Sequence, residues 1–379
     1  MMSKRTIIAA LALIAALAAR SLAAAPDKSA FFSEALGAEK AYRIYLPPGY
    51  EKDPAKRYPV VYLLHGYNFA RNNPDRFIPQ EEENHWMDQE QLGLVADCLF
   101  TVADYTALLA CLDKNGVGLP EAIVNAMKVD YPNPPLPLPE MIVVMPDGDS
   151  SFYMNREDGL KQWPPLDGPE FVDGVRKGAT GQYESYIAND LVKYIDSTYR
   201  TMPDRGLRGV GGFSMGGIGS MNLLLGNPDV FVSATSLSAL YTLTDMLSDP
   251  FSLSYMQGST PEIATVISAK PAGKASKIDK EFLKRNDPYY RLMNLKRMDV
   301  KIYYDAGSND TFAGMKQFAG FKKFQSALDK KGLASSPATH IIPATDLNAN
   351  GMHTARYWRS RIGNILAFHA AAFGLLESN

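Results

Sequence analysis

Residues 211–217 read Gly-Gly-Phe-Ser-Met-Gly-Gly, and this stretch carries the sharpest local signal in the chain. At its centre is a G-x-S-x-G motif around Ser214, between a short strand at residues 207–211 and a helix predicted to start near Met215. A serine on a tight strand-to-helix turn needs small neighbours, because the strained backbone leaves no room for Cβ atoms on either side. The stretch therefore predicts that Ser214 is a nucleophile.

Strand and helix patterns alternate along the rest of the chain. Residues 41–46 alternate apolar and polar side chains and predict an edge strand, whereas residues 58–64 are almost continuously apolar and predict a strand buried on both faces. Further strands are predicted at 141–145, 300–304 and 340–342, and helices at 183–199 and 355–375. This alternation predicts an α/β fold with a mainly parallel central sheet flanked by helices.

A serine nucleophile needs a base, and the chain has five histidines: His65, His85, His340, His353 and His369. In folds of this kind the base follows the last strand and returns to the serine through a loop. His353 fits this position, because it ends the loop at residues 348–353, before the closing helix. We predict that His340 and His369 are structural and that His85 at most lines the site.

The acid that orients the base is expected after a strand between the serine and the histidine. Residues 303–310 offer two candidates, Asp305 within the strand and Asp310 in the loop beyond it. A side chain in a loop can turn toward an imidazole, so we predict Asp310, with Asp305 as the alternative and Asp346 as a more distant one. The resulting order of serine, acid and histidine is that of the α/β-hydrolases.

Two backbone N–H groups are expected to stabilise the oxyanion of a tetrahedral intermediate. Met215 follows the nucleophile and supplies the first N–H group. The sequence Leu64-His65-Gly66-Tyr67 ends a buried strand, and its glycine lets the backbone turn, so Tyr67 is the predicted second donor. The alternative interpretation of His65-Gly66 is a plain turn at the end of a strand.

Several spaced motifs together resemble the esterase D-like family of serine α/β-hydrolases, which includes feruloyl and acetyl-xylan esterases, S-formylglutathione hydrolases, enterochelin esterases and mycolyl transferases. The motifs are residues 41–66, 143–148, 183–195 and 211–217, and Met352-His353 with Tyr357-Trp358. The resemblance implies the roles of nucleophile, acid and base for Ser214, Asp310 and His353, and supports Tyr67 and Met215 as oxyanion donors. It departs from the family between Gly66 and Met141, where this chain carries a long insertion.

The first residues have the pattern of a secretory signal peptide. Lys4 and Arg5 precede a charge-free apolar stretch, and small residues follow at 23–25. We expect residues 1–25 to be cleaved, because the apolar stretch is shorter than the roughly 20 residues that span a membrane. The expected mature protein, residues 26–379, is a single catalytic domain that is secreted or periplasmic and has no stable membrane anchor. Within it, residues 68–140 form either a cap over the pocket or a surface excursion.

Cys98 and Cys111 form an even pair, which export would allow to oxidise. However, apolar residues from Val95 to Leu112 recur at intervals of three, four and seven and predict one amphipathic helix. Thirteen residues of helix extend about 20 Å, beyond the reach of a disulfide. We therefore predict reduced core cysteines, with a disulfide only if this helix is broken.

The charge of the chain and the chemistry of a serine nucleophile bear on possible partners and cofactors. The net charge is −2 for the 379 residues, and loss of residues 1–25 would remove three cations and make it −5, so a nucleic-acid partner is disfavoured. Serine chemistry needs no cofactor and no metal, and the pair Asp147 and Asp149 is too small for a calcium cage.

We predict an exported serine esterase that acts through an acyl-enzyme on small-molecule or polysaccharide-linked esters. The alternatives are an acyltransferase with an alcohol or sugar acceptor and, less favoured, a non-catalytic envelope or carbohydrate-binding protein. Four aromatic residues follow core strands and are candidates for lining a pocket: Tyr67, Trp86, Tyr153 and Tyr241. The patterns leave the oligomeric state open.

Overall fold

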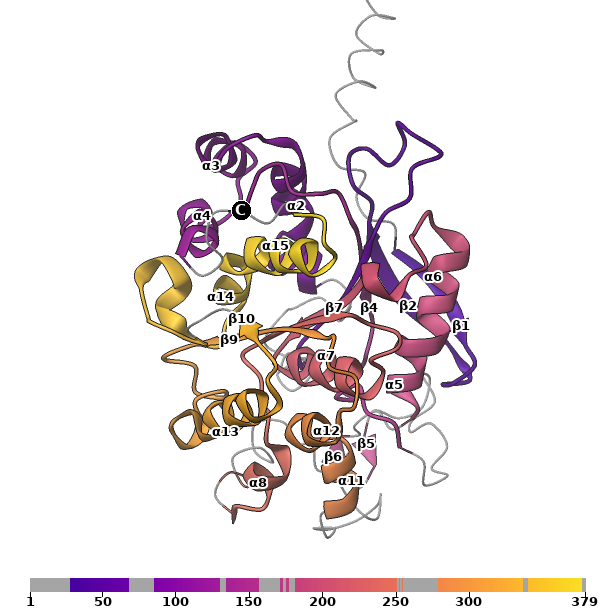
Figure 1. The fold of residues 1–379 in the computed structure, drawn as a ribbon, viewed down its shortest axis with the longest axis vertical. Coiled ribbons are helices and arrows are strands. Elements are labelled where there is room, and N and C mark those ends of the chain that lie inside the picture. The colour runs from indigo at the N-terminus through magenta and orange to yellow at the C-terminus, as the bar shows by residue number, and fades with distance from the viewer. Residues whose placement is uncertain are drawn as a thin grey trace, which may run out of the picture.

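The computed structural model describes residues 28–67, 85–129, 134–156, 171–172, 175–176, 181–250, 252, 254, 279–336 and 340–376. In these residues the chain forms a nine-stranded central sheet and a separate two-stranded ribbon (Figure 1). The strands of the central sheet are β1 (Lys28–Ser33), β2 (Ala38–Tyr45), β3 (Val60–Leu64), β4 (Ile142–Pro146), β7 (Arg208–Phe213), β8 (Ser233–Leu237), β9 (Lys301–Gly307), β10 (Ser335–Ser336) and β11 (Ile341–Ile342). The ribbon pairs β5 (Phe171–Val172) with β6 (Val175–Arg176). The predicted signal peptide lies outside the described residues.

Helices flank the sheet and connect its strands. Those before β8 are η3 (His85–Gln89), α2 (Leu92–Thr101), α3 (Tyr105–Lys114), α4 (Pro120–Val129), α5 (Tyr183–Ser185), η4 (Tyr186–Leu191), α6 (Val192–Thr198), η5 (Arg205–Leu207) and α7 (Met215–Gly226). Those after it are α8 (Leu243–Leu247), α11 (Lys280–Arg285), α12 (Pro288–Asn294), α13 (Met315–Lys331), η6 (Asp346–Gly351), α14 (Ala355–Ser360) and α15 (Ile362–Ala372).

The strand order is β1-β2-β4-β3-β7-β8-β9-β10, with β11 also paired to β9. From β4 through β10 every neighbouring pair is parallel, whereas β2 is antiparallel to both β1 and β4. The predicted α/β fold with a mainly parallel sheet is therefore confirmed. The prediction that residues 41–46 form an edge strand was wrong, because β1 pairs along the outer side of β2.

The sheet separates two hydrophobic layers. Tyr62 and Leu64 of β3 face one layer, and Val61 and Leu63 face the other, as alternation along a strand requires. Helices α7, α12 and α13 belong to the first layer, and α2, α3, α4 and α15 to the second (Figure 1). The described part of residues 68–140 thus contributes helices that pack with α15 into a core layer.

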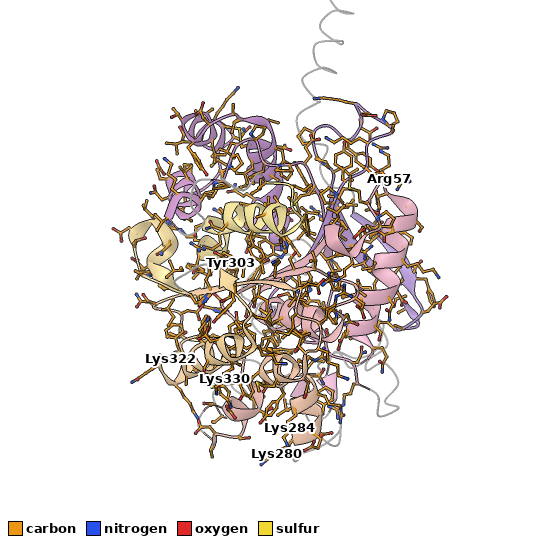
Figure 2. The ribbon with its side chains drawn as sticks, in the orientation of Figure 1. Arg57, Lys280, Lys284, Tyr303, Lys322 and Lys330 are labelled. Carbon is orange, nitrogen blue, oxygen red and sulfur yellow. A yellow bond between two sulfur atoms is a disulfide. The ribbon has the colours of Figure 1, made fainter. Side chains whose placement is uncertain are left out.

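The outer faces of the helices carry the charges. Lys280 and Lys284 of α11 and Lys322 and Lys330 of α13 are exposed, whereas Tyr303 of β9 is fully buried inside the fold (Figure 2). Within the described parts of the chain, no helix has the length and apolar character needed to cross a membrane.

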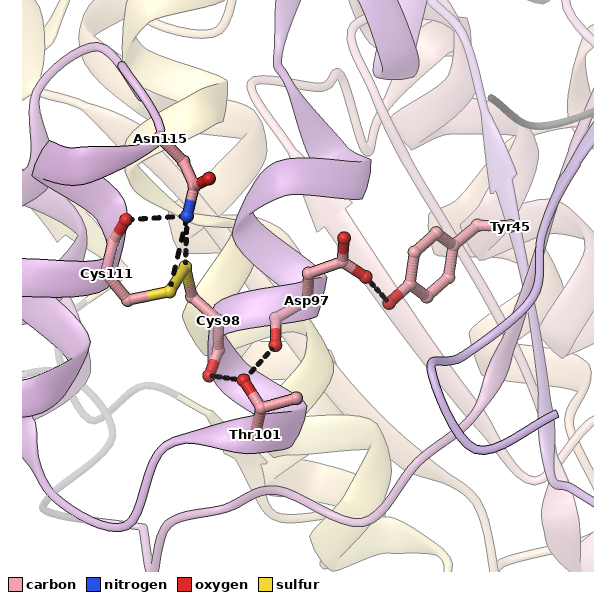
Figure 3. Close-up of a disulfide and its surroundings, with 6 residues drawn as sticks. All are labelled: Tyr45, Asp97, Cys98, Thr101, Cys111 and Asn115. Atoms are coloured by element: carbon pink, nitrogen blue, oxygen red, sulfur yellow. Dashed lines mark hydrogen bonds between the residues drawn. A yellow bond between two sulfur atoms is a disulfide. The ribbon is translucent and has the colours of Figure 1, made fainter. Parts of the chain in front are cut away.

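Cys98 and Cys111 form a disulfide, so the prediction of reduced cysteines on one helix was wrong (Figure 3). The helix is broken, because α2 ends at Thr101 and Val102 takes an extended conformation. Asp104 then caps the N-terminus of α3 by accepting a hydrogen bond from the Ala107 N–H at 2.8 Å. The two helices pack against each other, which brings the Cα atoms of the two cysteines to 5.8 Å.

The disulfide should stabilise the protein against unfolding. It closes a loop with a sequence separation of 13, and loops of about this size gain roughly 3 kcal/mol from a cross-link. We expect the double variant Cys98→Ser/Cys111→Ser to lose about that much free energy of unfolding in guanidinium titrations, with wild type in reductant behaving similarly. Two titratable thiols in the unfolded, unreduced wild type would contradict the disulfide.

Candidate active site

Ser214 lies at the sharp turn between β7 and α7. Its φ angle is 54°, a region that non-glycine residues rarely adopt, and its N–H donates to the Leu237 carbonyl of β8 at 2.8 Å. The first turn of α7 comes very close to the end of β3. A Cβ atom on Gly216 would lie 2.3 Å from the Leu64 carbonyl oxygen, so a residue without a side chain is required there.

His353 joins Ser214 to Asp310. His353 lies in the short segment of chain between η6 and α14, and its Nε2 atom is 2.9 Å from the Ser214 Oγ atom. Its Nδ1 atom lies 2.9 Å and 3.1 Å from the two carboxylate oxygens of Asp310. The His353 side chain is 13% exposed, whereas the Asp310 side chain is fully buried and Ser214 is 4% exposed. The structure thus brings together the three residues predicted from the sequence.

Asp310 is fixed by backbone as well as by the imidazole. It follows β9, and its Oδ1 atom accepts hydrogen bonds from the N–H groups of Phe312 at 3.0 Å and Ala313 at 2.8 Å. These bonds satisfy the buried carboxylate and hold its plane toward His353. The loop position of Asp310 is what allows this turn of the carboxylate.

The alternative acid, Asp305, binds an arginine and two tyrosine hydroxyls and not His353. Its carboxylate contacts the Arg361 guanidinium at 2.7 Å and accepts hydrogen bonds from the hydroxyls of Tyr303 at 2.6 Å and Tyr357 at 2.9 Å. This buried ion pair fastens α14 and the start of α15 to β9. Asp346, the more distant alternative, is exposed in η6.

Aromatic side chains pack around the base and beneath the nucleophile. Trp358 meets the His353 ring edge-on at 5.0 Å, stacks on Phe213 at 4.0 Å, and donates its indole N–H to Ser238 at 3.1 Å. Trp86 meets the Phe213 ring edge-on at 5.0 Å and donates its indole N–H to the Leu64 carbonyl at 3.0 Å. Trp86 is fully buried, so it supports the turn at Ser214 from within the core.

Three further aromatic residues were candidates for lining a pocket. Tyr153 and Tyr241 are fully buried, and Tyr67 is 4% exposed. The hydroxyl of Tyr241 hydrogen-bonds to the side chain of Ser236 at 2.9 Å, which ties it to the core of the sheet. The structure therefore gives Tyr241 a packing role.

The predicted oxyanion segment lies beside the nucleophile. A Cβ atom on Gly66 would lie 3.4 Å from the Ser214 Cβ atom and 2.5 Å from the Phe213 ring. The backbone of residues 65–67 therefore passes close to Ser214. Met215 begins α7, where the first N–H groups of a helix have no partner within the helix.

Two other histidines, His340 and His369, sit in structural surroundings. His369 hydrogen-bonds to Ser233 at 2.8 Å and Thr235 at 3.2 Å, and burial lowers its pKa to about 3. His340 lies 2.8 Å from the Tyr304 carbonyl oxygen. The side chain of His85 lies outside the described residues.

A buried lysine that the sequence analysis missed organises the turn after β4. The Lys40 side chain is 2% exposed, and its ammonium group lies 2.9 Å from the Asp147 carboxylate and 2.7 Å from that of Asp149. Burial alone would lower the pKa of Lys40, but these two carboxylates reverse the effect and raise the pKa well above its usual value. Lys40 lies on the same face of β2 as the buried residues Tyr42 and Ile44, so the period of two was the signal that it points inward.

The carboxylates of Asp147 and Asp149 therefore neutralise a lysine. Across the parts of the chain that the structure describes, no group of three His, Cys, Asp or Glu side chains is placed to hold a metal ion.

The fold and this arrangement of serine, histidine and aspartate define the class of α/β-hydrolases. The chain matches the family described as "Putative esterase" over residues 33–96 and 138–369, and it belongs to that family of carboxylic-ester hydrolases. The match omits residues 97–137, which hold the second half of α2, all of α3 and α4, and the disulfide.

Individual relatives are distant. An endo-1,4-beta-xylanase/feruloyl esterase of Xylanibacter ruminicola is 24% identical over 229 residues, which make up 60% of this chain and 23% of that protein. The chain thus spans less than a quarter of the length of this relative.

Solved structures share the fold over nearly their whole length. A ferulic acid esterase is 20% identical with a TM-score of 0.54, over 92% of this chain and 98% of the other. An S-formylglutathione hydrolase of Agrobacterium tumefaciens is 18% identical with a TM-score of 0.54, over 92% and 95%. MPT51 of Mycobacterium tuberculosis is 15% identical with a TM-score of 0.56, over 94% and 100%.

Proposed function

We propose that this esterase hydrolyses carboxylic esters through a catalytic triad of Ser214, His353 and Asp310. The observation that carries the proposal is the continuous hydrogen-bonded chain from the Ser214 hydroxyl through both imidazole nitrogens to a buried carboxylate. A serine hydroxyl is a weak nucleophile until an adjacent base removes its proton, and the carboxylate orients that base and stabilises its charged form.

The reaction proceeds in two halves. His353 takes the Ser214 proton as Oγ attacks the ester carbonyl carbon, and it then returns the proton to the leaving alcohol as the acyl-enzyme forms. Water next attacks the acyl carbon, giving its proton to His353, and the acid leaves as Ser214 is reprotonated. The backbone N–H groups of Met215 and Tyr67 stabilise the oxyanion in both halves. The closeness of Gly66 to Ser214 supports Tyr67 in this role.

For the substrate, we propose esters of aromatic acids, of the kind that relatives named as ferulic acid esterases act on, free or attached to polysaccharide. Aromatic surroundings of the base support this choice. The Phe312 ring lies 5.1 Å from the His353 ring. Met352, which precedes His353 in the chain, is 46% exposed, so an apolar side chain next to the base is available to a ligand from solvent.

We also propose that the protein is exported and that residues 1–25 are removed. The charged, apolar and small-residue segments of the first 25 residues support this, and so does the disulfide, since disulfides persist in oxidising compartments. Expression of the full chain in a bacterial host, followed by fractionation and intact mass, should give a periplasmic or secreted protein that begins at Pro26. An uncleaved chain confined to the cytoplasm would overturn the export proposal.

Replacing Ser214 by Ala should abolish ester turnover. We expect kcat on a simple aryl ester to fall by at least about 10⁴-fold, and labelling by a fluorophosphonate probe to disappear. Ser220→Ala is the matched control, because Ser220 lies on the same helix but bonds to the Gly217 and Thr235 carbonyls, so its kcat should stay at the wild-type value. Turnover that survives Ser214→Ala would refute the proposed function.

The variant Asp310→Asn tests whether Asp310, and not Asp305 or Asp346, is the acid of the triad. The amide cannot accept the imidazole N–H at both oxygens or stabilise the charged base, so we expect kcat to fall by about 10⁴-fold while the variant remains folded. Asp346→Asn, at an exposed position, should leave kcat unchanged. Full activity of Asp310→Asn in steady-state assays would remove Asp310 from the triad.

A further inference from the structure

The His65 imidazole connects the segment that passes close to Ser214 with the turn after β4. Its Nε2 atom accepts a hydrogen bond from the Gly148 N–H at 2.8 Å, and its Nδ1 atom lies 2.8 Å from the Gly66 carbonyl oxygen. The side chain is 1% exposed. The hydroxyl of Tyr153 also reaches the carbonyl oxygen of His65 itself, at 3.2 Å.

These contacts fix the tautomer of the ring. A backbone N–H can only donate, so Nε2 must present a lone pair to Gly148. The neutral imidazole then carries its proton on Nδ1 and donates it to the Gly66 carbonyl. Burial lowers the pKa of His65 despite the nearby carboxylates of Asp147 and Asp149, which favours this neutral form.

Holding the Gly66 carbonyl also sets the direction of the next N–H group. The peptide bond between Gly66 and Tyr67 is trans and planar, so its C=O and N–H point in opposite directions. Glycine has wide backbone freedom, and the peptide on its carboxyl side could rotate without a restraint. The imidazole supplies that restraint.

We propose that His65 is a positioning residue for the oxyanion hole: by holding the Gly66 carbonyl, it aims the Tyr67 N–H at the oxyanion. This inference rests on the proposed function, because it needs Ser214 to form a tetrahedral intermediate. The interaction acts on the transition state, so its loss should lower kcat and leave KM nearly unchanged.

Ion pairs hold the turn that contains Gly148, the hydrogen-bond donor to His65 Nε2. Gly148 stands between Asp147 and Asp149, and both carboxylates bind the buried ammonium group of Lys40. The Asp147 side chain also accepts a hydrogen bond from the Asp149 N–H at 2.9 Å. The N–H of Gly148 is therefore a fixed donor that holds the imidazole in place.

Two amide variants separate the two hydrogen bonds of His65. In His65→Asn the side-chain amide can stand where Nδ1 stood and still donate to the Gly66 carbonyl. In His65→Gln the amide reaches the place of Nε2 and can still accept from Gly148, but the donor to Gly66 is lost. We expect kcat of His65→Gln to fall by about 10²-fold with KM unchanged, and His65→Asn to recover most of this loss.

A trifluoromethyl ketone analogue of the substrate gives a second readout, because it forms a tetrahedral oxyanion adduct with a reactive serine. Its affinity should fall in His65→Gln by the same factor as kcat. His369→Gln is the matched control: His369 is equally buried but bonds to β8, so this variant should lose stability and keep wild-type kcat and inhibitor affinity.

Wild-type kcat in folded His65→Gln, or a loss in His65→Asn as large as in His65→Gln, would overturn the inference while the proposed function stands. Absence of ester turnover in the wild type would overturn both. If the variants do not fold, ¹⁵N spectra of the wild-type imidazole decide the matter. A neutral ring with its proton on Nδ1 between about pH 6 and 8 is expected, and a proton on Nε2 would refute the proposal.

Discussion

The close approach of α7 to the end of β3 is the constraint on which the candidate site depends. A side chain at Gly216 would collide with the carbonyl oxygens of Leu64 and His65, at 2.3 Å and 2.5 Å from its Cβ atom. This contact holds the start of α7 against the segment that leads to Gly66. As a result, the nucleophile, the first N–H groups of the helix and the proposed oxyanion segment all meet at one corner of the sheet.

Much of the site could be predicted from the sequence because its residues stand at chain positions that the topology fixes. Parallel strands put their carboxyl ends at one edge of a sheet, so residues after β3, β7 and β9 must meet there. The choice of Asp310 over Asp305 followed from the greater freedom of a loop side chain, and the hydrogen bonds to His353 agree with it.

Other features depend on contacts that a linear pattern does not contain. The apolar period from Val95 to Leu112 continues through a break at Val102, after which Asp104 caps a second helix. Strand β8 reads Ser-Ala-Thr-Ser-Leu and lacks the apolar run expected of a buried strand, yet all five residues are buried, because partners such as His369 satisfy its hydroxyls. No sequence pattern predicts the outer strand β1, and for this reason the prediction places an edge strand at residues 41–46.

Residues 97–137, which the family match omits, begin and end at neighbouring positions in the structure. The N–H of Leu138, just after this segment, donates to the carbonyl of Leu99, near its start, at 2.8 Å. Between these points the disulfide cross-links α2 to α3, and α3 packs on α4. Because its two ends meet, this segment can lengthen or shorten in evolution without rerouting β3 or β4, which makes it a natural place for members of this family to diverge.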